Sequence, residues 1–221
     1  DQVLTSDGTD ISWEDASGGG ISGLTGLVEN NSIWLGNDPT STTDTASYSV
    51  ALGTTALDAI TTGDNNTAIG YDAMTATTTG YSNVAVGSGT LATNTTSFHN
   101  TAIGLDALTA NTTGYSNIAI GNYALDANTT ASNNTAIGYL ALSANTTATG
   151  LTAVGKGTLE VSTGANNTAV GSNALAANTT ADSNVAVGTS ALTACTTSGA
   201  NVCIGAYAGD SVTTGDVRMV A

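Results

Sequence analysis

The chain has 221 residues and a formal net charge of −15, because it contains seventeen Asp or Glu, one His and only two cationic residues, Lys156 and Arg218. Charged residues make up 9 % of the sequence, against about 25 % in an average soluble domain. So few cations cannot neutralise a nucleic-acid backbone or an anionic membrane surface, one His leaves little for acid–base or metal chemistry, and no apolar run is long enough to cross a bilayer.

Residues 1–31 lie outside the repeat that fills the rest of the chain. We predict that residues 2–13 form a short β-hairpin, because Asp7-Gly8 is a typical hairpin turn. Residues 17–20 (Ser-Gly-Gly-Gly) indicate a flexible joint, and Leu24 to Val28 lead into the first repeat. We therefore expect a separate N-terminal hairpin followed by a Gly-rich joint.

From residue 32 onward a glycine recurs every seventeen residues, with a single spacing of sixteen. The register is marked by Gly36, Gly53, Gly70, Gly87, Gly104, Gly121, Gly138, Gly155, Gly171, Gly188 and Gly205. A helical-hairpin repeat needs about 33 residues, whereas seventeen suit one coil of a β-solenoid with two short strands and two turns. The sequence therefore predicts an all-β fold, a parallel β-solenoid (β-roll) of about eleven coils over residues 32–217, with residues 218–221 beginning a further coil.

Two apolar columns are expected to fill the core of this small coil. The residue before each glycine is always a branched aliphatic, and the residue four positions after it is almost always Leu. Each such side chain contributes about 1.5–3 kcal/mol when buried. The predicted core residues are Ile69, Val86, Ile103, Ile120, Ile137, Val154, Leu108, Leu125 and Leu142.

An almost unbroken column of Ala lies two residues before the glycines. Side chains alternate between the two faces of a strand, so the Ala column is on the face opposite the aliphatic column. A stripe of Ala covers little surface but permits close approach of another chain, and we predict that it forms the subunit interface of a homo-oligomer. Alternation alone also permits the reverse assignment, with the aliphatic column toward the partner subunits. The predicted interface residues are Ala68, Ala85, Ala102, Ala119, Ala136 and Ala153.

Three further features follow from in-register stacking. Asn begins eight of the units, so Asn side chains are expected to form a ladder of amide hydrogen bonds. The glycine column predicts a corner that needs positive φ or close backbone approach. The sixteen-residue unit is expected to lose its residue in the turn at Ser162–Gly164, which leaves its strands aligned.

Units such as Asn117-Ile118-Ala119-Ile120-Gly121 resemble the head repeat of trimeric autotransporter adhesins of the YadA type. The longer pattern Asn-Thr-Ala-Ile-Gly-x-x-Ala-Leu-x-Ala-Asn-Thr-Thr-Gly is still more similar to repeats of phage tail fibres and related bacterial surface fibres. The segment from Gln2 to Trp13 also resembles a module of such fibres. The resemblance covers nearly the whole chain and implies a left-handed, homotrimeric rod that presents a receptor-binding surface.

Tyr81, Phe98 and Tyr115 occupy one column in three successive coils. They are either an exposed strip that contacts a receptor or glycan, with His99 beside it, or a packing ladder or subunit contact. His99 has no Cys, His or paired carboxylate at ligand spacing, so we expect no metal, cofactor or catalytic site.

Isolated polar residues have plain structural interpretations. Cys195 and Cys203 stand in different columns, and we predict that they are buried and unpaired. Asp58, Asp72, Asp106 and Asp126 lie on different turns without a calcium-loop pattern, which indicates solvated charges.

We expect a non-enzymatic fibre protein of the virion, in which a trimeric rod binds a host-surface receptor and other fibre or tail proteins. The alternative is the head segment of a bacterial surface adhesin. An ice-binding solenoid is a remote third possibility, because the Thr residues are adjacent at turns and do not alternate on one flat face. A glycan-degrading tailspike would need paired carboxylates in a groove, and no such pair stands out.

Overall fold

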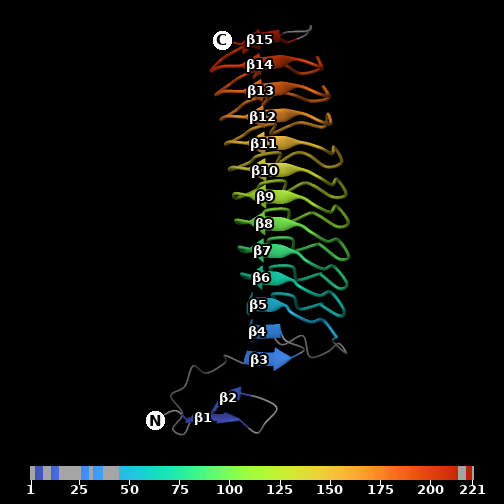
Figure 1. Ribbon diagram of the computed structural model, residues 1–221, viewed down its shortest axis with the longest axis vertical. Coiled ribbons are helices and arrows are strands. Elements are labelled where there is room, and N and C mark those ends of the chain that lie inside the picture. Colours follow the sequence, from blue (N-terminus) through green and yellow to red (C-terminus); the bar gives the residue numbers. More distant parts are fainter. Residues whose placement is uncertain are drawn as a thin grey trace.

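The computed structural model of the chain describes residues 3–6, 11–14, 26–29, 32–36, 45–213 and 218–220. Within these ranges every helix or strand element is a β-strand, and the strands form two separate sheets (Figure 1). Strands β1 (Val3–Ser6) and β2 (Ile11–Glu14) pair antiparallel as a two-stranded sheet. The Asp7-Gly8 turn predicted between them lies outside the described residues.

The second sheet contains thirteen strands stacked in sequence order (Figure 1). Its strands are β3 (Gly26–Glu29), β4 (Ser32–Gly36), β5 (Val50–Gly53), β6 (Thr67–Ile69), β7 (Val84–Val86), β8 (Thr101–Ile103), β9 (Ile118–Ile120), β10 (Thr135–Ile137), β11 (Thr152–Val154), β12 (Thr168–Val170), β13 (Val185–Val187), β14 (Val202–Ile204) and β15 (Arg218–Val220). From β4 onward each strand pairs in parallel with the next; Ala119, for example, lies beside Ala136. This arrangement confirms the parallel β-solenoid with its seventeen-residue repeat.

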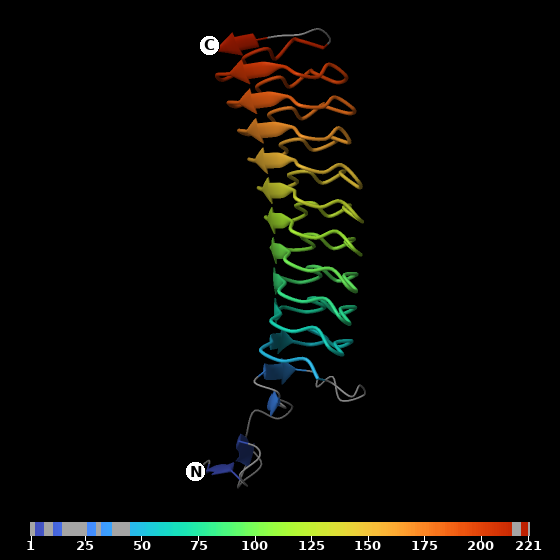
Figure 2. The same ribbon diagram turned by 45° about the vertical axis from the view of Figure 1, so that its right-hand side comes forward.

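Between β5 and β14 the chain completes nine turns. At about 4.8 Å per strand this part of the stack is about 43 Å long. Figure 2 shows the strands on one side of the stack and the turns of each coil on the other. β3 pairs antiparallel with β4, so the first strand of the sheet runs opposite to the parallel stack above it.

Each coil contains one three- or four-residue strand, and the predicted second strand is absent from the described coils. The segment after the corner glycine is a run of turns, in which residues two and four positions after the glycine have positive φ. Tyr123 and Leu125, for example, have φ of 58° and 52°. A β-strand requires strongly negative φ, so the residues on this side of the coil cannot form a second β-strand.

The corner glycines are required for two separate reasons. Gly121 has a φ of 133°, which side chains other than Gly rarely tolerate. A Cβ atom on Gly121 would also lie 2.5 Å from the carbonyl oxygen of Gly138 in the next coil. The same geometry recurs along the column, which confirms the predicted corner and shows that close stacking and positive φ act together.

The Ala column faces the interior and the aliphatic column faces outward, so both of these face assignments were wrong. The Ala residues of the strands, which were expected at a subunit interface, are completely buried inside their own coil: Ala68, Ala85, Ala102, Ala119, Ala136 and Ala153. The residues before the glycines, which were expected in the core, lie half-buried or exposed on the outer face: Ile69, Val86, Ile103, Ile120, Ile137 and Val154.

The physical reason for this reversal is the width of the coil. Leu108, Leu125 and Leu142 are fully buried and fill the interior from the turn side. A second Ala column, which includes Ala107 and Ala124, is buried beside them. With this volume already occupied, the opposing strand has room for Ala but not for Ile, because interiors are packed to crystal-like density.

Two ladders of buried Asn complete the interior. In the predicted ladder the side-chain amide of Asn117 donates to the side-chain oxygen of Asn100 at 3.2 Å, which confirms amide bonding between coils. A second ladder comes from the turn Asn residues, in which Asn128 donates to the side-chain oxygen of Asn111 at 3.0 Å. Sequence reasoning treated these residues only as turn formers and missed their burial.

The sixteen-residue coil keeps its strands in register, since Thr152 pairs with Thr168. The hydroxyl of Thr163 donates to the carbonyl oxygen of Thr179 at 2.7 Å, and the amide of Asn167 donates to the carbonyl oxygen of Gly164 at 3.1 Å. The missing residue therefore falls in the turn around Thr163–Gly164, as predicted.

Candidate functional site

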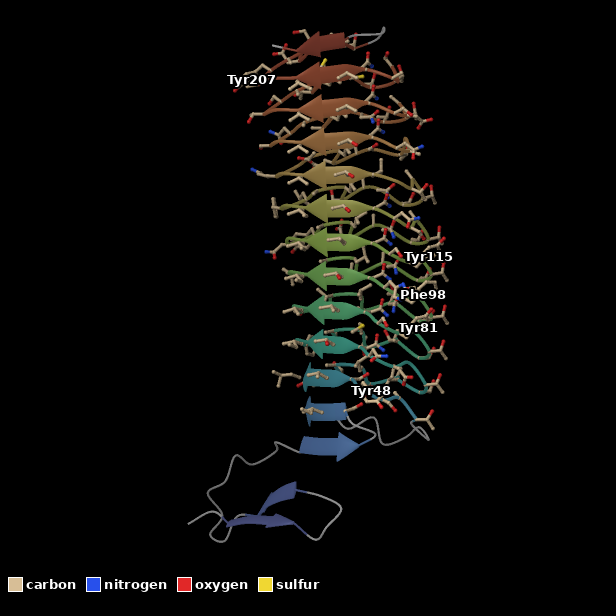
Figure 3. All side chains as sticks on the ribbon, viewed as in Figure 1. Tyr48, Tyr81, Phe98, Tyr115 and Tyr207 are labelled. Carbon is tan, nitrogen blue, oxygen red and sulfur yellow. The ribbon has the colours of Figure 1, made fainter. Side chains whose placement is uncertain are left out.

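An aromatic ladder formed by Tyr81, Phe98 and Tyr115 runs along one edge of the solenoid (Figure 3). The centroids of Tyr81 and Phe98 are 5.0 Å apart with an interplanar angle of 7°, and those of Phe98 and Tyr115 are 5.1 Å apart at 11°. The spacing follows from the rise of about 4.8 Å per coil. The three rings therefore form a continuous stack across three coils.

His99 packs against one side of this ladder. Its imidazole packs edge-on against both Tyr81, at 5.5 Å, and Phe98, at 5.2 Å between ring centroids. The backbone N–H of His99 also donates to the carbonyl oxygen of Tyr81 at 3.3 Å. The structure thus brings the four residues singled out as receptor or glycan contacts into one cluster, with Tyr81 and Tyr115 42 % and 43 % exposed.

The coil itself does not require aromatic residues at this position. In three other coils the column holds a small polar side chain, Asp64, Ser132 or Asp182, that accepts a hydrogen bond from the backbone of the preceding coil. Asp64 accepts from the N–H of Ser47 at 2.8 Å, and Ser132 accepts from the N–H of Tyr115 at 3.0 Å. A phenyl or phenol ring in this place gives up that bond, so the ladder is a local departure from the repeat.

A second candidate surface is the outer face of the stacked strands. The exposed or half-buried column before the corner glycines is entirely aliphatic and continues through all described coils. Its residues are Leu52, Ile69, Val86, Ile103, Ile120, Ile137, Val154, Val170, Val187 and Ile204. Beside it runs a column of Val, Thr and Ile, including Ile118 at 40 % exposure. We call these two columns together the outer strand face.

Exposed residues just past the corner widen this apolar area. Tyr71, Leu105 and Tyr139 each follow a corner glycine directly and are substantially exposed. Sequence reasoning missed them because the position varies between coils. A contiguous apolar surface on a folded chain indicates an interaction site.

The remaining polar candidates are two Cys and several Asp residues, which are spread over several columns of the solenoid. No group of three or more His, Cys, Asp or Glu able to hold a metal ion occurs in the described part of the chain. Cys195 and Cys203 are both buried, as predicted, and burial raises the pKa of the Cys195 thiol.

Asp126 differs from the solvated charge that was predicted. Burial raises the pKa of its carboxyl group, backbone N–H groups of Asp126 and Ala127 partly offset this, and the nearby Asp106 raises it further. One oxygen of Asp126 is buried without a hydrogen-bond partner among the described residues. Asp72, by contrast, accepts a hydrogen bond from the hydroxyl of Thr55 in the preceding coil.

Among the described residues no helix is long and apolar enough to span a membrane. Comparisons of the chain with protein-family models, with curated proteins and with solved structures found no match.

Proposed function

We propose that the chain is a rod segment of a virion fibre, such as a phage tail fibre, that assembles as a homotrimer and attaches the particle to a host surface. The proposal joins the resemblance of the repeat to fibre and adhesin sequences with one structural observation, the apolar outer strand face. That face supports a rod in which the subunits cover one another along their length.

The outer strand face suits self-association for three reasons. It is continuous, because the same column is aliphatic in every described coil from Leu52 to Ile204. It carries no ionisable side chain within β5 to β14, so identical faces meet without like-charge repulsion. Burying Ile and Val side chains contributes about 25 cal/mol per Å² of apolar surface, and the contribution accumulates over ten coils.

Host attachment places the rod outside the cell, with a surface receptor and other fibre or tail proteins as partners. A bacterial surface adhesin would use the same rod and is the alternative. Ice binding is less well supported, because the Thr residues of the outer strand face are interrupted by Val84, Ile118 and Val185 and do not form a uniform Thr array.

The assembly can be tested by light scattering of the purified full chain during size-exclusion chromatography. We expect a trimer for the parent and monomers for the double variant Ile120→Asp/Ile137→Asp, with circular dichroism unchanged. The matched control is Thr130→Asp/Thr147→Asp, which adds the same two charges to exposed turn residues and is expected to remain trimeric. A monomeric parent, or a trimeric Ile120→Asp/Ile137→Asp variant, contradicts the proposal.

The biological location is tested by electron microscopy of the source material with an antibody against the chain. Label on fibres of virions supports the attachment role, and label on cell envelopes without virions supports the adhesin alternative.

A further inference from the structure

The free end of the aromatic ladder has the features of a carbohydrate-binding site. One face of the Tyr115 ring is stacked on Phe98, and no other described ring contacts Tyr115. In the next three coils the same column holds the smaller residues Ser132, Thr149 and Ala165. The ring of Tyr115 therefore projects from the solenoid as a shelf that is held in orientation by the stack beneath it.

The backbone position next to this shelf in the following coil carries a polar residue, Asn133. Asn133 has the same position relative to Tyr115 as His99 has relative to Tyr81. Both Asn133 and His99 are exposed, lie one coil after the tyrosine, and donate their backbone N–H to its carbonyl oxygen. His99 packs against the ring of Tyr81, so the equivalent position places the Asn133 amide beside Tyr115. An amide supplies both donors and an acceptor, which matches the hydroxyl groups of a sugar.

The charge of the chain restricts which sugar can bind. Apart from Lys156, which follows a corner glycine on a different edge, the described residues include a single further cation, Arg218 in β15. The formal net charge is −15. Sialylated, phosphorylated or uronic-acid ligands would meet repulsion without a compensating Arg or Lys, so the surface favours an uncharged glycan.

From these observations we infer that the free face of Tyr115, together with Asn133, binds a neutral hexose or N-acetylhexosamine unit of a surface glycan. The apolar face of the sugar ring stacks on the phenol ring, and its hydroxyl groups bond to the Asn133 amide. This inference gives the proposed attachment role a ligand class and rests on that proposal for its biological meaning. Phe98 and Tyr81 act by fixing the orientation of Tyr115.

The test uses the purified full chain and a printed panel of neutral hexose and N-acetylhexosamine oligosaccharides, with sialylated and uronic-acid glycans alongside. Titration calorimetry then measures Kd for the best neutral oligosaccharide. We expect Tyr115→Ser to weaken binding by about tenfold or more, which corresponds to at least about 1.4 kcal/mol. Asn133→Ser is expected to weaken it severalfold, and Tyr81→Ser less than Tyr115→Ser.

Natural repeats make these substitutions compatible with folding. Ser occupies the Tyr115 column at Ser132 and the Asn133 column at Ser116. The control is Tyr207→Ser, which removes an exposed tyrosine that lies apart from the aromatic ladder and matches Ser190 in its own column. Circular dichroism verifies that each variant is folded.

Absence of binding to every neutral glycan, preference for anionic glycans, or equal loss in Tyr115→Ser and Tyr207→Ser overturns the site. The outcomes separate it from the proposed function. If the chain is trimeric and located on virions but binds no neutral glycan, the glycan-binding inference is rejected and the proposed fibre function stands. If the chain is monomeric but binds a neutral glycan, the fibre function is rejected and the binding site stands.

Discussion

The side-chain amide of Asn83 donates a hydrogen bond to the side-chain oxygen of Asn66, in the preceding coil, at 3.2 Å. The backbone N–H of Asn83 donates to the same oxygen at 3.1 Å. One buried oxygen thus satisfies two donors from the next coil, and the pattern repeats at Asn100 and Asn117. Hydrogen bonds inside the coil therefore connect successive coils along the axis.

Removing one member of this ladder is expected to destabilise the stack. Asn100→Ala leaves the backbone and side-chain donors of Asn117 without their acceptor, and each buried unsatisfied group costs about 1–3 kcal/mol. Chemical denaturation followed by circular dichroism measures the loss. Thr96→Ala, at an exposed turn residue of the same coil, is the control and should change stability by less than about 0.5 kcal/mol.

Adjacent residues of one strand should respond in opposite ways to the same substitution. Ala119 is completely buried and Ile120 faces outward, so Ala119→Asp places an unpaired carboxylate in the core whereas Ile120→Asp places it on the outer strand face. We expect Ala119→Asp to be destabilised by several kcal/mol and Ile120→Asp to retain its fold as an isolated chain. Measurements at low concentration, where subunits are dissociated, are decisive. An unfolded Ile120→Asp with a folded Ala119→Asp would reverse the assignment of faces.

The corner glycines should not tolerate even a methyl group. Gly121→Ala combines an unfavourable φ with a Cβ atom 2.5 Å from backbone of the next coil, and such contacts cannot relax without moving the coil. We expect a large loss of thermal stability or no soluble product. Gly157→Asn is the matched control, because Asn173 occupies that column with a φ of 57°. Wild-type-like melting of Gly121→Ala would show that the corner is looser than described.

The stability contributed by Asp126 should depend on pH. Its folded-state pKa is raised by burial, so the ionised form is disfavoured by folding. This penalty is absent below the ordinary value of 3.8 and grows as pH rises through the folded-state pKa. Asp126→Ser, which matches Ser143 in the next coil, should therefore be more stable than the parent at pH 7, with the difference shrinking toward pH 3. A constant difference across this range would contradict the assignment.

Leu140 and Leu142 both have positive φ, at 57° and 55°, but only Leu142 is fully buried. A non-glycine residue in this conformation costs about 1–2 kcal/mol, and Asn tolerates it better than Leu. We expect Leu140→Asn to raise the melting temperature by a few degrees and Leu142→Asn to lower it strongly. Calorimetry distinguishes the two, and a lower melting temperature for both variants would show that Leu140 contributes more packing than strain.

The period, the parallel register, the glycine corner and the first Asn ladder were predictable because each depends on one residue type recurring at one spacing. Which face of the strand lies inside the coil was not predictable from the sequence. Alternation of Ala119 with Ile118 and Ile120 defines two faces, but which face is inside depends on the volume supplied by Leu125 on the other side of the coil. The absence of a second strand in each coil was also not predictable. Leu rarely adopts positive φ, so nothing in the sequence indicated that the Leu segment forms turns.

The aromatic cluster was predictable as a column and not as an arrangement. Tyr81, Phe98 and Tyr115 share a spacing of seventeen, which placed them above one another. The contact of His99 with two of the rings depends on the local backbone at its positive φ of 58°. The free face of Tyr115 follows from the small side chain at Ser132, a neighbour one coil away.

The turn that lost a residue at Thr163–Gly164 shows that a corner of the coil can change in length while the strands on either side remain paired. Axial rise and corner length are thus independent, and equivalent turns such as Thr112–Thr113 offer insertion points at regular intervals of about 4.8 Å. A peptide inserted at any of them would be displayed at a height set by its coil number, which makes the solenoid a molecular ruler for the spacing of attached groups.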